Sequence, residues 1–454
     1  MEKLVEQWKR IKNCTISEIL IHGRNYLVGN VATKALGLIS MPIFTRLLSR
    51  EDYGIVAVYT AMAGLAVTLT TLNVTDGISR YYYEDKRNDF GAFLSSVLQM
   101  AAAFQIPIIV ALLIWPNVIT NLIGLPSSVA YFIVIALLHG VLFKVFRQIN
   151  ISRRNSREFV QVSVSEGYVG FGLSWGLLAV MPKTGFLLRI AGVAIVQCLS
   201  AIWMAIRTSS YVNWQRPRWE HIRYSLYFSL PRMPYVLSGL ILGQSDRIML
   251  ANISGLEAAG VYSVGYSVGA LSLIVITAIT PALIPNFYQL MNDGKTGVVD
   301  KINRQISWLI CSACTGLMLC GGFILQFLSD EQFHDGARVV PAVVMGYIFY
   351  AQAGVYNRFC GYYKRTVLQS LGALLAAAAN ILLNLWWLPI FGMVAAAYTT
   401  LISYGIQATI TWLLTKRFVK GHVTPLVPLL KPLSVALGVL VIIEGDSIWR
   451  IVAS

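Results

Sequence analysis

The sequence predicts an all-α polytopic integral membrane protein. Of its 454 residues, 56% are hydrophobic and only 13% are charged, and the mean hydropathy is +0.64. A soluble domain has about 25% charged residues, so this composition excludes an ordinary soluble protein. Apolar runs recur from residue 25 to residue 443. Many of them reach the length of about 20 residues that a helix needs to cross a bilayer.

Thirteen apolar segments are predicted to be membrane-spanning helices joined by short connections. They cover residues 25–48, 54–78, 90–115, 128–149, 159–181, 186–206, 224–250, 259–288, 305–328, 338–360, 367–388, 391–415 and 427–443. The first two form a hairpin with a polar corner at residues 49–53, and Pro42 predicts a kink near the outer end of the first. Several prolines lie at the start of the last segment. The number of spans is therefore left open between twelve, thirteen and fourteen.

These segments divide into two predicted six-helix bundles around a central cavity, with an extra C-terminal helix. The predicted order is a cytoplasmic segment 1–24, an N-terminal bundle 25–206, a cytoplasmic linker 207–223, a C-terminal bundle 224–415, and a loop with the additional span at 416–454.

A weak internal repeat favours this division. Arg46 and Gly54 of the first hairpin match Arg247 and Gly260, which follow 201 and 206 residues later. Two bundles of six spans would share one orientation, as parallel repeats about an axis near the membrane normal do.

The distribution of Lys and Arg places the N-terminus in the cytoplasm. With that orientation, the cytoplasmic connections contain 24 basic residues, and the opposite connections contain three, namely Arg50, Lys183 and Arg450. Topology and contact with anionic lipid therefore explain most of the net charge of +15, and a nucleic-acid partner is not needed. Residues 1–24 lack the apolar core of a cleaved signal peptide.

No motif for a cofactor, a metal ion or hydrolytic chemistry is visible. The five histidines are scattered, and there is no Walker-type glycine loop or metal-ligand spacing. Cys311 and Cys314 form a CxxC inside an apolar helix without nearby histidines, which is typical of helix packing. The sequence therefore predicts a protein without cofactors that is not an enzyme.

Ionisable residues inside the predicted spans are the candidate functional groups. Nine are basic and three are acidic, and they are Lys34, Arg46, Lys144, Arg147, Arg189, Arg232, Arg247, Arg338, Arg358, Asp76, Glu166 and Asp246. Most lie close enough to a helix end for the side chain to reach the interface. Asp246 beside Arg247 is interpreted most simply as an interfacial pair or a helix-end contact.

Four ionisable residues lie deeper in their predicted helices. Lys34 follows Asn30 on one polar stripe of the first span, and Arg232 lies beside two prolines that could open a water-lined face. His139 and Glu166 are deep as well, although such residues can merely bridge helices. Because three acids cannot neutralise nine bases, a phosphate-bearing ligand in a hydrated cavity is the natural complement.

Two groups of motifs carry a family resemblance. The first comprises Pro42, Thr45 to Ser49, Glu51, Tyr53, Gly54, Gly77, Arg80 and Tyr81. The second comprises residues 225–231, 245–247, 260–263, 380–384, 388–389, 392 and 395–397. Together they resemble the bacterial polysaccharide (O-antigen type) flippases of the multidrug/oligosaccharidyl-lipid/polysaccharide exporter superfamily, over about residues 20 to 420. The thirteenth span departs from the twelve or fourteen helices common in that family.

The resemblance implies a flippase of the bacterial inner membrane. Its expected substrate is a polyprenyl-pyrophosphate-linked oligosaccharide for O-antigen, capsule or exopolysaccharide assembly, moved by alternating access of the two bundles. Membrane lipids, a polysaccharide polymerase and a chain-length regulator are the expected partners. The predicted substrate-binding residues are Lys34, Arg232, Asn30, His139, Arg46 and Arg247. The predicted ion-coupling residues are Glu166, Asp76 and Asp246.

Other functions are compatible with such a sequence. A lipid II flippase or a multidrug transporter would share the superfamily, although a drug-cation antiporter should have deep acids rather than deep bases. A membrane polymerase or glycosyltransferase should have long outer loops, which are absent here. A scaffold protein that transports nothing is disfavoured, because charges buried in the membrane are energetically costly.

Overall fold

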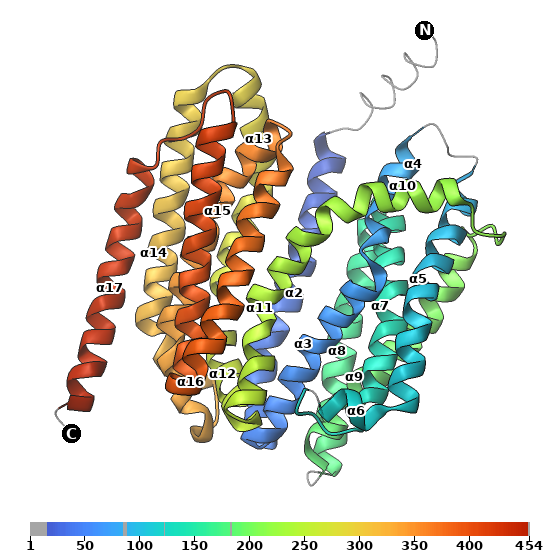
Figure 1. Cartoon of the computed structure of the whole chain (residues 1–454), viewed down its shortest axis with the longest axis horizontal. Coiled ribbons are helices and arrows are strands. Elements are labelled where there is room, and N and C mark those ends of the chain that lie inside the picture. Colours follow the sequence, from blue (N-terminus) through green and yellow to red (C-terminus); the bar gives the residue numbers. More distant parts are fainter. Residues whose placement is uncertain (1–15, 85–88, 122, 182–183, 453–454) are drawn as a thin grey trace.

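The computed structural model describes residues 16–84, 89–121, 123–181 and 184–452 (Figure 1). This part of the chain is almost entirely helical and contains no β-strand, which confirms the predicted fold class. Lys183, residues 1–15 of the predicted cytoplasmic segment and the side chain of Asn30 lie outside the described part.

Nine helices and one short helical turn form the N-terminal half of the described chain. They are α2 (Ile16–Leu47), α3 (Arg50–Thr71), η1 (Val74–Asp76), α4 (Gly77–Tyr83), α5 (Phe90–Ile114), α6 (Pro116–Asn121), α7 (Val129–Ser152), α8 (Ser156–Val180), α9 (Gly185–Ser209) and α10 (Trp219–Ser229).

The C-terminal half follows through a short helical turn. Its elements are η4 (Leu230–Arg232), α11 (Met233–Ile253), α12 (Leu256–Gly269), α13 (Ser272–Asn292), α14 (Thr296–Leu328), η5 (Glu331–Val339), α15 (Val340–Tyr362), α16 (Thr366–Phe418) and α17 (Val427–Val452).

Each of the thirteen predicted spans falls on helical structure, but several boundaries differ. The second helix ends at Thr71, seven residues early, because Leu72 and Asn73 adopt left-handed backbone conformations with φ of 44° and 55°. The predicted span 224–250 is broken at Pro231, which separates α10 from α11. The segments 367–388 and 391–415 are two helices within α16 that meet at a kink at Gly392, where the backbone is non-helical with φ of 59°.

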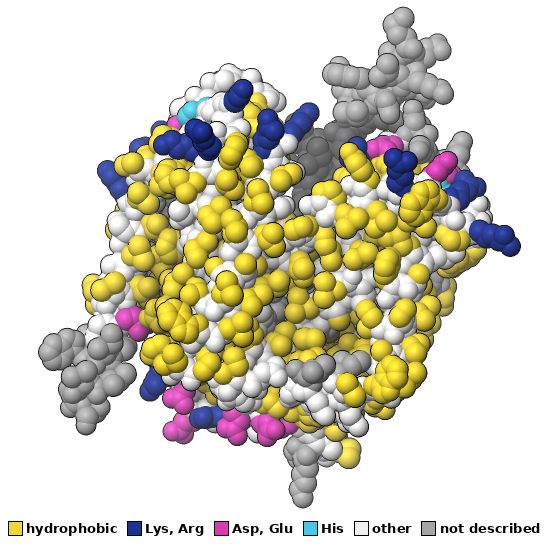
Figure 2. Space-filling view, viewed as in Figure 1, with side chains coloured by type: hydrophobic (Ala, Val, Ile, Leu, Met, Phe, Trp, Pro, Cys, Tyr) yellow, Lys and Arg dark blue, Asp and Glu magenta, His cyan; other side chains and the backbone are white. Residues whose placement is uncertain are grey.

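Eight described helices are long and apolar enough to cross a membrane, or nine if α12 and α13, bent by 43°, form one broken span. Helices α2, α8 and α11 also have at least 21 residues but are less apolar. Figure 2 shows apolar side chains across the middle of the visible face, with most visible Lys and Arg side chains along one end. The acidic side chains visible on this face lie mainly at the other end. The protein is a multi-pass membrane protein.

The two halves form two lobes that meet at one end of the molecule (Figure 1). Contact is closest between α3 and α12. A Cβ atom on Gly54 would lie 1.9 Å from the carbonyl oxygen of Leu256, and one on Gly260 would lie 2.1 Å from that of Arg50. Only glycine permits this approach. Gly54 and Gly260, matched by the internal repeat, therefore face each other where the lobes join.

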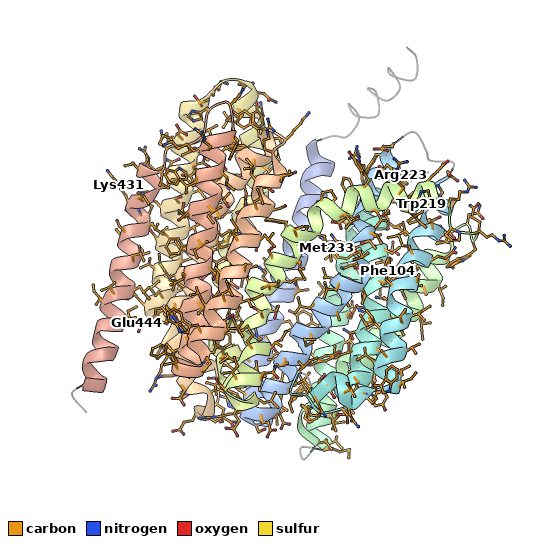
Figure 3. All side chains as sticks on the ribbon, in the orientation of Figure 1. Phe104, Trp219, Arg223, Met233, Lys431 and Glu444 are labelled. Carbon is orange, nitrogen blue, oxygen red and sulfur yellow. The ribbon has the colours of Figure 1, made fainter. Side chains whose placement is uncertain are left out.

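At the opposite end, α10 crosses over the N-terminal lobe (Figures 1 and 3). Ser225 donates a hydrogen bond to the carbonyl oxygen of Val74 over 2.7 Å, and His221 lies 2.8 Å from the carboxylate of Asp89. Met233 marks the beginning of α11 in Figure 3. The chain thus passes from one lobe to the other through a proline-containing elbow at η4.

Candidate functional site

Three cavities lie in a row between and within the lobes. The N-terminal chamber has a volume of 520 Å³ and is lined by α2, α7, α8 and α9. The middle chamber, of 220 Å³, is lined by α2, α3, α9, α11 and α12. The C-terminal chamber, of 510 Å³, is lined by α11, α12, α13, α15 and α16.

Shared side chains connect the chambers. Ser40 and Arg189 line both the N-terminal and the middle chamber. Gln244, Arg247 and Ser267 line both the middle and the C-terminal chamber. The three cavities are therefore neighbours across the lobe interface, with an arginine in the wall at each junction.

Arg189 extends from the first turns of α9 towards α2. Its guanidinium carbon lies 4.0 Å from the centre of the Phe44 ring, and its Nη1 donates a hydrogen bond to Ser174 over 3.3 Å. Stacking on an aromatic face holds a guanidinium while its edge stays available for an anion. The sequence interpretation treated Arg189 as an arginine that reaches the outer interface, so its place at this junction was missed.

Arg247 is the corresponding arginine of the C-terminal lobe. Its guanidinium carbon lies 4.4 Å from the centre of the Tyr266 ring, and its Nη1 donates to Gly243 O over 2.7 Å and to Gln244 Oε1 over 2.9 Å. Within the described residues, no carboxylate lies within 4.0 Å of the side chains of Arg189 or Arg247. Two guanidinium groups without acidic partners therefore border the middle chamber.

Two further predicted residues line the N-terminal chamber and face each other. His139 Nε2 on α7 and Glu166 Oε1 on α8 lie 2.9 Å apart, with side chains that are 10% and 14% exposed. Glu166 Oε2 has no hydrogen-bond partner among the described residues. This pair joins two helices, and it also presents an acceptor to the chamber.

Asp246 lies in the C-terminal lobe, on the other side of α11 from Arg247. Its carboxylate accepts hydrogen bonds from Tyr262 over 2.7 Å, Thr400 over 2.5 Å and Asn384 over 2.7 Å. Asn380 contributes a longer bond of 3.4 Å. The predicted interfacial pair with Arg247 does not form, because neighbouring residues on a helix point about 100° apart. Asp246 is instead a buried carboxylate with neutral partners.

Lys34 lies between the lobes rather than in the lining of any of the three chambers. Its Nζ donates a hydrogen bond to Thr277 Oγ1 on α13 over 3.0 Å. The neighbouring residues Thr33, Leu36 and Gly37 line the N-terminal chamber. The charge is thus close to the N-terminal chamber, and in this structure its hydrogen bond joins the lobes.

Arg232 and Asp76 lie together at the elbow between α10 and α11. Arg232 Nη1 is 3.4 Å from Asp76 Oδ2, and the two side chains are 56% and 18% exposed. Asp76 also accepts hydrogen bonds from Asn73 over 2.7 Å and from Gln148 over 3.3 Å. Neither residue lines the three chambers.

The remaining predicted residues are Asn30 and Arg46. Asn30 lies in α2, near Lys34, and nothing of its side chain is described. Arg46 is exposed and donates to the carbonyl oxygen of Pro42 on its own helix. It borders none of the three chambers.

The sequence interpretation also missed the aromatic character of the C-terminal chamber. Five tyrosines from four helices line it: Tyr235, Tyr266, Tyr347, Tyr350 and Tyr404. The 22 tyrosines and 11 tryptophans of the sequence could stack on sugar faces or form interfacial belts, and belts are the commoner use. No spacing in a single helix reveals a cluster to which α11, α12, α15 and α16 all contribute.

Comparisons with known proteins agree with this architecture. The family described as "Polysaccharide biosynthesis protein" matches residues 25–291. The "Probable flippase AglR" of Haloferax volcanii is 28% identical over 40% of this chain and 38% of its own length. The "Succinoglycan biosynthesis transport protein ExoT" of Rhizobium meliloti is 23% identical over 59% of this chain and 53% of its own. Each of these two matches covers only part of the relative's own length.

A solved structure shares the fold across nearly the whole chain. The lipid II flippase MurJ in an inward closed conformation superposes with a TM-score of 0.71 over 92% of both chains, at 15% identity. At that level of identity the similarity concerns the fold alone.

Proposed function

The chain belongs to the polysaccharide biosynthesis protein family, and from this premise we propose that it is a flippase of the bacterial inner membrane. Its substrate would be an oligosaccharide linked to a polyprenyl pyrophosphate, moved from the cytoplasmic to the outer leaflet for surface polysaccharide assembly. The head group would cross through the three chambers while the lipid tail stays in the bilayer. Rocking of the two lobes would open the path alternately to each side.

One observation carries this proposal. Arg189 and Arg247 border the middle chamber from opposite lobes without a carboxylate partner in the described part. Buried cations are costly, so an anion that binds between them is favoured. A diphosphate offers oxygens to both guanidinium edges. A drug cation would be repelled at the same place, which favours a lipid-linked phosphate over a multidrug substrate.

Coupling to an ion gradient would use Asp246. Its carboxylate accepts hydrogen bonds from the hydroxyl groups of Tyr262 and Thr400 and from the amide nitrogen of Asn384, all of them neutral donors. A buried carboxylate with neutral partners can bind and release a proton during the transport cycle. Glu166 is the second candidate in this role, whereas Asp76 already faces Arg232.

The expected orientation places the end with α10 in the cytoplasm. Figure 3 shows Arg223 on α10 and Lys431 on α17 towards the same end of the molecule, with Glu444 nearer the other. An excess of basic side chains at one end favours the cytoplasmic side there. In this orientation the lobes meet at the outer side, and the path faces the cytoplasm.

A reconstituted transport assay tests the proposed function. Purified protein in liposomes should move a lipid-linked glycan between leaflets without changing the length of the glycan, which a membrane-impermeant oxidant of sugars can report. Replacing both Arg189 and Arg247 by Ala should lower the rate about 100-fold, since each charge-assisted hydrogen bond contributes about 1.5–3 kcal/mol.

Arg147→Ala is the matched control, because Arg147 is an exposed arginine of α7 that lines none of the three chambers. Its transport rate should equal that of the wild type. Cleavage or elongation of the glycan by the protein alone would contradict the proposal and favour a membrane enzyme.

Thiol labelling tests the orientation. In a cysteine-free background, cysteines at Arg154 and Arg216 should be protected from an impermeant reagent in intact cells, and one at Asn121 on α6 should react. All three native side chains are exposed. Labelling at position 154 in intact cells would reverse the orientation.

A further inference from the structure

The C-terminal chamber differs chemically from the other two. Its lining contains five tyrosines and the amides of Gln244 and Gln407, and its one charged lining residue is Arg247, at the junction with the middle chamber. No carboxylate is part of the described lining. A volume of 510 Å³ lies in the range of about 300–1,000 Å³ that small-molecule sites occupy.

The tyrosine rings form a continuous wall. The ring centres of Tyr347 and Tyr404 are 5.9 Å apart, and those of Tyr350 and Tyr404 are 5.6 Å apart. Tyr266 adds a hydroxyl that lies 2.8 Å from the hydroxyl of Tyr347. The rings offer flat apolar faces and their hydroxyls offer hydrogen bonds, a combination that suits ligands with both characters.

Gln407 supplies an independent indication of a ligand. This residue of α16 is only 4% exposed and lines the chamber. Its Oε1 has no hydrogen-bond partner among the described residues. A buried acceptor without a partner is unfavourable, so a donor is expected to occupy the adjacent space. A hydroxyl group is such a donor.

We propose that the C-terminal chamber is a saccharide subsite that binds the sugar next to the diphosphate. A pyranose ring packs its C–H face on tyrosine rings and directs its hydroxyls to amide and phenol groups. A polyprenyl chain would leave the Gln407 amide oxygen without a hydrogen-bond donor. This inference rests on the proposed function, because the diphosphate between Arg189 and Arg247 would place the first sugar at the shared junction residues.

Binding of short glycolipids tests the subsite. The probes are farnesyl pyrophosphate and farnesyl pyrophosphate that carries glucose, galactose or N-acetylglucosamine, with the purified full-length protein in nanodiscs. We expect at least one sugar to raise the affinity about tenfold over the bare pyrophosphate. Gln407→Leu and Tyr350→Ala should each reduce that sugar-dependent gain about fivefold, as the loss of one hydrogen bond or one ring contact predicts. Binding of the bare pyrophosphate should not change.

Two variants control for general effects on folding. Gln197→Leu removes another side-chain oxygen without a described partner, on α9 and outside the three chambers. Tyr131→Ala removes a tyrosine that is 52% exposed. Both should keep the sugar-dependent gain, and all four variants should keep the thermal transition of the wild type.

The outcomes separate the two proposals. If no sugar raises the affinity, or if the gain survives in both chamber variants, the saccharide subsite is wrong. If the Arg247→Ala variant then binds none of the pyrophosphate probes, the proposed diphosphate site is still supported. If no probe binds the wild type, the proposed function and the subsite are both contradicted.

Discussion

The two ends of the lobe interface are built in different ways, and they are named the outer end and the inner end after the proposed orientation. At the outer end, backbone meets backbone: Gly54 and Gly260 bring α3 and α12 together. Gln332 donates hydrogen bonds to the carbonyl oxygens of Thr45 over 3.1 Å and Leu48 over 3.3 Å. Such contacts exclude side chains and allow little adjustment. The outer end therefore acts as a firm closure in this state.

At the inner end, long side chains make the connection. Lys34 reaches Thr277 over 3.0 Å, and Arg232 reaches Asp76 over 3.4 Å. Both cations are on flexible stems, and the arginine is more than half exposed. Contacts of this kind can exchange a protein partner for a phosphate or for water at little cost. The difference suggests that the inner end changes partners during transport, while the outer end must separate as a unit.

The largest expected effect comes from the outer end. Gly54→Val places side-chain atoms where a carbonyl oxygen already lies, 1.9 Å from the position of the Cβ. The lobes could not close there, so we expect transport to fall about 100-fold, as overpacking of up to about 3 kcal/mol predicts. The leaflet assay measures the rate, and impermeant thiol labelling of a cysteine in the middle chamber reports whether the outer side stays open.

Gly64→Val on the same helix is the control, because nothing lies within 4 Å of a Cβ atom at Gly64. It should transport at the wild-type rate. Wild-type transport by Gly54→Val would show that close backbone contact at the outer end is not required.

The next effect concerns the charge of Lys34. If the ammonium group assists the diphosphate, Lys34→Ala should lose about tenfold or more in transport rate at normal protein abundance. Arg should restore part of the rate, whereas Gln should not, since it lacks the charge. The leaflet assay, with abundance measured by immunoblot, distinguishes these results.

Thr277→Val is the informative companion, because it removes the partner of Lys34 and keeps the charge. A rate near that of the wild type would support the charge hypothesis. If Thr277→Val loses as much as Lys34→Ala, the residue acts only as a connection between the lobes.

These residues also show what can be predicted from the sequence. Hydrophobic runs predict the helical fold class, because each helix in the bilayer must satisfy its own backbone, whereas eight or nine of the described helices are candidate spans instead of the predicted thirteen. The break after Thr71 is not predicted, since it depends on the backbone conformation of Leu72 and Asn73. The role of Lys34 in substrate binding stays a prediction, because Lys34 lines none of the three chambers. Its hydrogen-bond partner Thr277 is 243 residues away in the chain, and no local pattern indicates that contact.

Arg189 illustrates a different limit. Its position near the start of α9 suggests a side chain at the membrane interface, and depth along a helix is all that the sequence offers. Because the lobes converge near this end of α9, Arg189 lines the N-terminal and middle chambers instead. Where two lobes meet is a property of their packing, and no pattern within one helix contains it.

The smallest expected effect tests the exchangeable character of the inner end. Arg232 is exposed whereas Asp76 is half-buried, and ion pairs near the protein surface contribute about 0.2–1 kcal/mol. If the pair acts only as a contact between the elbow and the N-terminal lobe, Arg232→Ala and Asp76→Asn should each lower transport by about two- to fivefold, and the charge-reversed double variant should restore it. If Arg232 instead binds the diphosphate, Arg232→Ala should lose far more than Asp76→Asn, and charge reversal should not rescue. Small and equal losses of transport rate in the two single variants, restored by the charge-reversed double variant, would mean that Arg232 is an exchangeable contact of the inner end. Arg189 and Arg247 would then remain the proposed anion site.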